Sequence, residues 1–259
     1  MADRDESAVV DEVAPGATRT AVRASERARL LAVFTALVEP LGQALPESTE
    51  VVLHDLAQLP DSIVAVHGNV TGRRIGDPAT DLLLQRMTAG ELDHAVGYQT
   101  TLPDGRSMRS TTMIIKDSAG TPVAALCLNS DLSVWQSLHR ITAQMIGLDP
   151  GAETEPPDQS PDATADGPTE VFARDVDELA AHLIHQAILE QQVPVDLMRK
   201  EHKLAVVRSL QARGMFLLRD AVEMIATSLG VTRFTIYNYL NEIADEPGSN
   251  GSRRKGSER

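Results

Sequence analysis

The stretch from Asp220 to Ile243 (DAVEMIATSLGVTRFTIYNYLNEI) has the residue spacing of two short helices joined by a tight turn. In its first half, apolar residues recur at the spacing of one helical face: Val222, Ile225, Ala226 and Leu229. Asp220 and Glu223 have the spacing of a capping box at the start of this helix. Gly230 supplies the left-handed residue that ends a helix sharply. The stretch therefore predicts a helical hairpin whose apolar face needs a supporting domain.

The second helix of the hairpin is predicted to bury one face and to expose another that suits DNA. Thr232 can cap this helix, and the residues that turn inward are Ile236, Tyr239, Leu240 and Ile243. The residues that turn outward are Phe234, Tyr237, Asn238 and Asn241, with Arg233 at the flank. Amides can bond an adenine edge, arginine can read guanine or hold phosphate, and an aromatic ring can touch a thymine methyl group. We predict that the outward residues, Arg233, Thr232 and Lys200 contact DNA; the structural alternative is a hairpin buried in another kind of domain.

The distribution of charge is compatible with DNA binding, although the chain as a whole has a net charge of −13. Residues 196–244 contain seven basic and five acidic side chains, whereas residues 149–170 contain seven carboxylates and no Lys or Arg. A locally basic surface attracts the phosphate backbone, and negative charge elsewhere discourages nonspecific adhesion. Lys200, on the helix expected to support the hairpin, is the predicted phosphate contact.

The region before the acidic stretch predicts a sheet flanked by helices. Five β-like runs occupy residues 50–56, 62–66, 97–102, 108–116 and 121–129, and helical patterns occupy residues 25–45, 79–87 and 132–146. Short turns join the last three runs, which favours antiparallel pairing. This order resembles that of PAS-type sensor domains, in which a small ligand lies between an antiparallel five-stranded sheet and helices.

The predicted organisation is an α+β chain with two domains. A disordered N-terminus (1–24) precedes a PAS-like sensor domain (25–148), an acidic Pro-rich linker (149–170), an all-α helix-turn-helix domain (171–245) and a disordered basic tail (246–259). A helix at residues 175–192 carries an apolar stripe from Val176 to Ile188, and Asp196 is expected to cap the next helix with Leu197 facing inward. We expect the stripe to form a homodimer or higher homo-oligomer, because one helix-turn-helix has little surface for selective binding.

Two parts of the chain resemble the YheO-like bacterial transcription regulators. The stretches HDLAQLPDSIVAVHGNVTGRRIG (54–76) and RSTTMIIKDSAGTPVAALCLNSD (109–131) resemble their PAS domain, and RGMFLLRDAVEMIATSLGVTRFTIYNYLNE (213–242) resembles their helix-turn-helix. The resemblance covers about residues 27–148 and 171–243. It implies a one-component transcriptional regulator, a repressor, whose PAS-like domain senses a small polar metabolite such as an amino acid. Its partners would be a double-stranded DNA operator and this effector.

Polar residues at the ends of the predicted strands are the candidate effector contacts. They combine cations, hydroxyls and amides, which suit a polar ligand with a carboxylate. The candidates are His54, Asp55, Asn69, Thr71, Arg73, Arg109, Ser110, Thr111 and Asn129. In the alternative interpretation, residues 69–72 form only a turn, the hydroxyls satisfy the backbone and His54 is a core residue. Because only the linker is expected to join the domains, the signal is expected to pass through dimer geometry, with helices 25–45 and 132–146 in contact.

Other classes of function have weaker support in the sequence. Cys127, His54 and Asp55 could form a nucleophile, a base and an orienting group, but AALCLNS is typical of a buried strand, so we predict no enzyme. His182 and His185 indicate a solvated helix face rather than a metal site, and no cofactor is predicted. The chain lacks a long apolar run, which predicts a cytoplasmic protein without a membrane partner. The alternative function is a PAS-type protein-interaction adaptor without sequence-specific DNA binding.

Overall fold

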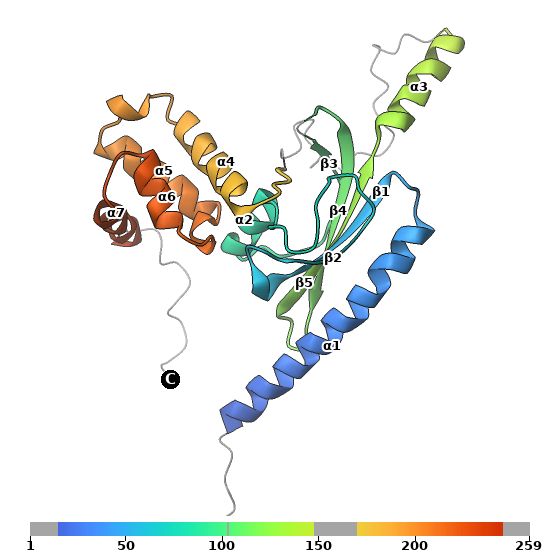
Figure 1. Cartoon of the computed structure of the whole chain (residues 1–259), viewed down its shortest axis with the longest axis horizontal. Coiled ribbons are helices and arrows are strands. Elements are labelled where there is room, and N and C mark those ends of the chain that lie inside the picture. Colours follow the sequence, from blue (N-terminus) through green and yellow to red (C-terminus); the bar gives the residue numbers. More distant parts are fainter. Residues whose placement is uncertain (1–14, 103, 148–169, 246–259) are drawn as a thin grey trace, which may run out of the picture.

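The computed structural model describes residues 15–102, 104–147 and 170–245, which form a sheet domain followed by a helical domain (Figure 1). The sheet is antiparallel, with the strand order β2-β1-β5-β4-β3. Its strands are β1 (Thr49–Asp55), β2 (Ile63–His67), β3 (Ala95–Thr101), β4 (Ser107–Lys116) and β5 (Pro122–Asp131). The predicted α+β fold is confirmed, and each predicted strand end lies within two residues of the observed one. The predicted basic tail and nearly all of the predicted linker lie outside the described residues.

Strand alternation gives the sheet two faces with different partners. Leu53 of β1 and Leu126 of β5 lie on one face, where they pack with Val38 of helix α1 (Pro15–Ala44). The next residue along β1, His54, lies on the other face and lines a cavity. Successive side chains of a strand point to opposite faces, so the two halves of the predicted pair His54 and Asp55 are separated by the sheet.

Helix α1 begins ten residues before its predicted start, at Pro15 rather than Ser25. Proline is well tolerated in the first turn of a helix, and the segment 15–24 contains three alanines, the residue with the highest helix propensity. Further along the helix, Arg27 forms an ion pair with Asp55, and Glu26 accepts a hydrogen bond from the backbone of Ser118. These contacts hold α1 across the sheet, as Figure 1 shows.

The helical domain is built around the stripe of α4 (Val176–Leu189). Leu183 of this stripe is 1% exposed and belongs to one core with Leu210 of α5 (Lys200–Ala212). Helices α6 (Ala221–Ser228) and α7 (Arg233–Asp245) complete this core. The prediction that the α4 stripe forms the dimer contact is therefore wrong, because its own chain covers it. Leu197 is also exposed rather than inward, since it lies in a short 3-10 turn before α5.

The two domains share a continuous apolar core through helix α2 (Asp81–Ala89). Leu83 and Leu84 of α2 lie in the same cluster of buried residues as Leu183 of α4. Gly214, which follows α5 with φ of 79°, approaches α2 so closely that an added Cβ would lie 3.0 Å from the carbonyl oxygen of Leu84. A side chain at this position would need the helices to separate. The expectation that only a linker joins the domains is therefore wrong.

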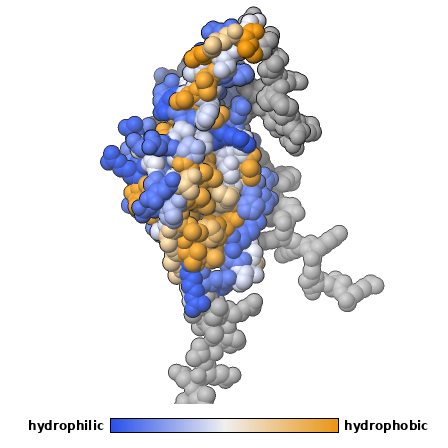
Figure 2. Space-filling model, turned by 90° about the vertical axis from the view of Figure 1, so that its right-hand side faces the viewer, coloured by the Kyte–Doolittle hydropathy of each residue, from blue (hydrophilic) through white to orange (hydrophobic). Residues whose placement is uncertain are grey.

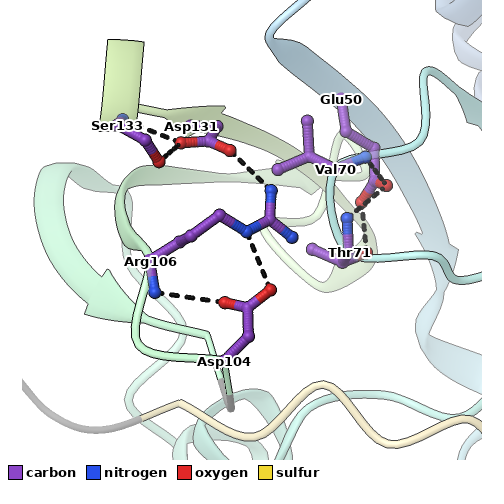
Figure 3. A network of polar contacts seen from close by, with 7 residues as sticks. All are labelled: Glu50, Val70, Thr71, Asp104, Arg106, Asp131 and Ser133. Carbon is purple, nitrogen blue, oxygen red and sulfur yellow. Dashed lines mark hydrogen bonds and ion pairs between the residues drawn. The ribbon is translucent and has the colours of Figure 1, made fainter. Parts of the chain in front are cut away.

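Helix α3 (Ser133–Met145) projects away from the sheet (Figure 1). Its start is anchored by Asp131, which accepts a 2.8 Å hydrogen bond from the backbone N–H of Ser133 and a 2.6 Å bond from Arg106 (Figure 3). Large apolar residues on α3 are exposed: Val134, Trp135, Leu138, Ile141 and Met145. Figure 2 shows this apolar surface at the top of the molecule and further apolar surface below it. None of the described helices combines the length and apolar character that a membrane crossing requires.

Candidate nucleic-acid interface and ligand cavity

The turn between α6 and α7 has the geometry predicted for it. Gly230 has φ of 62°, and the N–H of Val231 returns to the carbonyl of Ala226 at 3.0 Å. Thr232 accepts a 3.2 Å hydrogen bond from the N–H of Thr235, so its hydroxyl caps α7 as expected. The small side chain of Ala226 is buried beside the turn. These features fix how α7 leaves α6.

Two residues near α6 behave differently from their prediction. Asp220 is left-handed, with φ of 58°, and its side chain makes no cap hydrogen bond. Capping requires an extended backbone, so the predicted capping box with Glu223 is absent. Lys203 of α5, counted above only among the basic side chains of residues 196–244, donates a 2.8 Å hydrogen bond to the carbonyl of Leu229. It satisfies a carbonyl at the end of α6 and so positions the turn.

Helix α7 presents the predicted recognition face to solvent. Ile236, Tyr239 and Ile243 are buried in the domain core. The residues predicted to meet DNA are all exposed: Thr232, Arg233, Phe234, Tyr237, Asn238 and Asn241. Phe234 is 73% exposed and Tyr237 is 54% exposed, so two aromatic rings lie on the solvent side of a helix whose other face is buried. The structure thus brings the predicted DNA-contacting residues of α7 together on one surface.

The cations near this face are paired with exposed carboxylates. Arg233 Nη2 lies 2.5 Å from Glu223 Oε2, and Lys200 Nζ lies 2.7 Å from Glu242 Oε2. Exposed pairs of this kind contribute only about 0–1 kcal/mol to stability. A DNA phosphate or guanine edge can therefore replace either carboxylate at small cost.

A cavity lies between the sheet and the segment that leads into α4. It is lined by His54, Arg73, Thr80, Leu82, Leu83, Arg86, Tyr98, Thr112, Cys127, Asn129, Glu170 and Phe172. The free space inside is about 10 Å³, which is room for about one water molecule. The protein's own side chains therefore fill most of the cavity.

Three of the nine predicted effector contacts line this cavity: His54, Arg73 and Asn129. Because side chains alternate along a strand, Asp55, Arg109 and Thr111 lie on the face of the sheet opposite the cavity, and α1 covers part of that face. Asn69 is exposed in its loop. Ser110 and Thr71 do not line the cavity, but each contacts a residue that does. Ser110 donates a 3.0 Å hydrogen bond to Asn129 Oδ1, and Thr71 contacts Arg73.

Buried Glu50 organises the loop that carries Arg73. Its carboxylate accepts 3.0 Å hydrogen bonds from the N–H groups of Val70 and Thr71 and a 2.6 Å bond from the Thr71 hydroxyl (Figure 3). The Thr71 hydroxyl in turn accepts a 3.3 Å bond from Arg73 Nε. Thr71 is thus a positioning residue for the guanidinium, and Glu50 is a further positioning residue that the sequence analysis missed.

Comparison with known proteins agrees with both halves of this architecture. Residues 25–147 match the family model of the YheO-like PAS domain, and residues 179–241 match that of an HTH domain. The chain therefore carries a YheO-like PAS domain followed by a helix-turn-helix domain.

Curated relatives share this arrangement over most of their length. Transcriptional regulator DauR of Pseudomonas aeruginosa is 28% identical over 214 residues, which cover 82% of this chain and 93% of DauR. YheO of Escherichia coli is 27% identical over 218 residues, covering 83% of this chain and 85% of YheO. A protein of Haemophilus influenzae is 26% identical over 215 residues, with 82% and 90% coverage.

The cavity of the PAS domain favours neutral forms of several titratable groups. Burial is the main cause that lowers the pKa of His54, and its Nδ1 lies 2.9 Å from the hydroxyl of Ser62. Burial also raises the pKa of Cys127 to about 11 and raises that of Tyr98. A thiol with this pKa is a weak nucleophile at neutral pH, and Asp55 lies across the sheet from it. The possible triad of Cys127, His54 and Asp55 is therefore not assembled.

Glu170 was predicted to lie in the linker, yet its carboxyl is buried in the cavity. Its Oε2 accepts a 3.2 Å hydrogen bond from the hydroxyl of Tyr98. Two residues later, the ring of Phe172 lies beneath the guanidinium of Arg73, with 5.0 Å between the guanidinium carbon and the ring centroid. The available signal was the change from the acidic linker to the apolar pair Val171 and Phe172.

Replacing Glu170 with Gln is expected to change how stability depends on pH. Burial is the largest cause that raises the pKa of Glu170, and nearby Asp81 raises it further. The folded protein then holds this proton more tightly than the unfolded chain. The associated stabilisation is complete below the ordinary glutamate pKa and is lost as pH rises through the raised value. Urea denaturation between about pH 4 and pH 8 should show a steeper loss in wild type than in Glu170→Gln; parallel curves would contradict the assignment.

Proposed function

We propose that this DNA-binding transcriptional regulator is a repressor that binds its operator as a homodimer and responds to a small polar metabolite held in the PAS domain. The observation that carries the proposal is the formed, outward-facing recognition surface of α7 on a domain whose core continues into the sensor domain. An event in the cavity therefore has a packed route to the DNA-binding helices.

The α7 face supports sequence-specific DNA binding rather than only nonspecific attraction. Phosphate contacts fix position, whereas base edges are read by amides, guanidiniums and apolar groups in the major groove. Asn238, Asn241 and Phe234 offer such groups from one exposed helical surface. A protein-docking hairpin, as in the adaptor alternative, would have little need for two adjacent amides beside an arginine.

The exposed stripe of α3 supports a homodimer, with a second copy of α3 as its partner. Val134, Leu138, Ile141 and Met145 are spaced by four, three and four residues, which is the seam spacing of a two-stranded coiled coil. An isologous contact of this kind covers the same apolar surface on both subunits. Two helix-turn-helix units can then meet two half-sites about one helical turn of DNA apart, or a multiple of it.

The cavity supports repression that an effector relieves. In the conformation described, side chains of the protein fill the cavity, and the recognition helix is already formed and exposed. DNA binding in this conformation does not require an effector. A metabolite that opens the cavity would favour a different conformation, and it shifts the equilibrium only by its difference in affinity between the two.

Selection of fragments from the source genome with the full-length protein tests this function. We expect enrichment of near-palindromic sites, and we expect a reporter gene behind such a site to be expressed less when the protein is present. Higher expression would make the protein an activator. No enrichment above random fragments would favour the adaptor, which retains no DNA above background.

A further inference from the structure

Two buried hydrogen-bond donors in the cavity have no partner among the described residues. Arg73 is 3% exposed, and its Nη1 makes no hydrogen bond. The amide nitrogen of Asn129, which is 2% exposed, is also without a partner, although its oxygen is held by Ser110. Buried polar groups are normally satisfied, and an unpaired donor costs about 1–3 kcal/mol. Both groups line the same cavity and both require an acceptor.

The charge of the cavity also favours an anion. Arg73 and Arg86 both line it, and neither has a carboxylate within 4.0 Å in the part of the chain that the structure describes. Arg86 instead lies over the ring of Tyr98, at 5.7 Å from the ring centroid. Glu170 acts on the Arg73 guanidinium only from beyond ion-pair distance. A ligand carboxylate in direct contact would match the donor geometry of the guanidinium.

Among the described residues, Glu170 is the one that places a carboxyl in the lining of the cavity, and it directly precedes the helical domain. It belongs to what we term the connecting segment, residues 170–172. The N–H of Val171 donates a 2.8 Å hydrogen bond to Asp81 at the start of α2, and Phe172 stacks on Arg73. Because the remaining space holds about one water, any larger ligand must displace part of this segment.

We propose that the cavity binds a small carboxylate-bearing effector on Arg73 and Asn129, and that this carboxylate expels Glu170 and with it the connecting segment. The inference rests on the ligand-sensing function proposed above and deepens it. The free space holds about one water, and a second carboxyl beside Glu170 can be buried there only if one of the two is protonated, so the ligand and Glu170 compete for the cavity. Glu170 is thus an internal competitor that keeps the cavity closed.

Displacement of the connecting segment carries the signal to the DNA-binding domain. The segment continues into α4 only a few residues later, where Asp175 caps the helix by accepting a 2.7 Å bond from the N–H of Glu178. Leu179 and Leu183 of α4 pack in the core shared with α2. Moving residues 170–172 out of the cavity therefore weakens the packing of α4 in the core that it shares with α2. The helix-turn-helix units of a dimer would then lose their fixed relative orientation.

Acetate is a suitable probe, because Glu170→Ala removes a fragment with the composition of acetate. In thermal unfolding of the full chain, sodium acetate is compared with sodium chloride at equal ionic strength. Acetate is expected to raise the Tm of Glu170→Ala by about 2 °C or more at saturation. Wild type should show no such shift, because acetate lacks the further contacts with which a larger effector would displace the Glu170 side chain. Acetamide and ethylamine, which match acetate in size but not in charge, should have no effect on either protein.

Further variants show whether the shift depends on the proposed contacts. Adding Arg73→Met to Glu170→Ala should abolish it, whereas the exposed control Glu201→Ala should behave as wild type. Should Glu170→Ala not fold, Glu170→Gln keeps the size without the charge and should gain an acetate response that wild type lacks. The inference is overturned if acetate acts equally on wild type and variants, or if its effect survives Arg73→Met.

One further result would change the role proposed for Glu170 but not the function proposed for the protein. If ethylamine stabilises wild type and this effect is lost in Glu170→Gln, the carboxylate is a counter-ion for a cationic effector. These thermal shifts need no DNA, so they are separate from the genomic selection. A protein that enriches operator fragments but fails the acetate test remains a regulator with a different effector chemistry.

Discussion

A chain carrying Leu138→Asp and Ile141→Asp is expected to be monomeric and to bind its operator about 100-fold more weakly, or worse, than wild type. Both residues are half exposed on α3, at 51% and 53%, so the substitutions leave the folded monomer intact. In a paired α3 seam each would place a charge in an apolar contact, and the lost burial alone is about 1.5–3 kcal/mol per side chain. Light scattering and operator titration measure the two effects.

The matched control changes the same helix on its other side. Gln136→Asp with His139→Asp adds the same two carboxylates at exposed positions outside the apolar seam. This variant should remain dimeric and bind operator as wild type does. The α3 contact is refuted if wild type itself is monomeric, or if the apolar-face variant still forms dimers that protect two half-sites.

The dimer surface shows what hydrophobic periodicity can and cannot establish. The stripe of α4 was correctly predicted as apolar and helical, and it was assigned to the wrong partner. Periodicity says that a face is covered, but it does not say whether its own chain or a second copy covers it. That choice depends on α5 and α6 reaching Leu183, whereas no buried cluster of the described residues includes Leu138 of α3.

The candidate cavity shows a related distinction between local and long-range information. Strand bounds were predictable because alternation and turn residues are local signals. Alternation also implies that His54 and Asp55 cannot share a cavity, and the structure selects His54. The part played by Glu170 was not predictable, because it joins a linker terminus to Tyr98, 72 residues earlier in the chain.

Some helix ends were predicted correctly and one was not, because backbone geometry decides whether a residue can act as a cap. Thr232 and Gly230 were predicted correctly, since cap and turn residues act on the few residues beside them. Asp220 has the residue type of a cap but a left-handed backbone, and it lies between the buried residues Leu218 and Ala221. Residue type alone therefore did not determine the start of α6.

Asn238→Ala is expected to weaken binding to the selected operator by about 1–3 kcal/mol, or roughly 5-fold to 150-fold, if the amide reads an adenine edge. The side chain is exposed on α7 and supports nothing in the domain core, so stability should be unchanged. Binding to random DNA should change far less, because that binding comes from phosphates. Titration of operator and random duplexes at one salt concentration measures the difference.

Two control variants make this test specific to the recognition face. Asn69→Ala is the same chemical change at an exposed loop of the sensor domain, and it should leave operator affinity unchanged. Lys200→Ala should weaken binding to operator and to random DNA about equally and reduce the salt dependence of binding, as expected for a phosphate contact.

Arg233→Ala should resemble Asn238→Ala, because the exposed ion pair of Arg233 with Glu223 can be exchanged for a base contact at small cost. If Asn238→Ala and Arg233→Ala both bind the operator like wild type, α7 reads DNA with another face or does not read it at all.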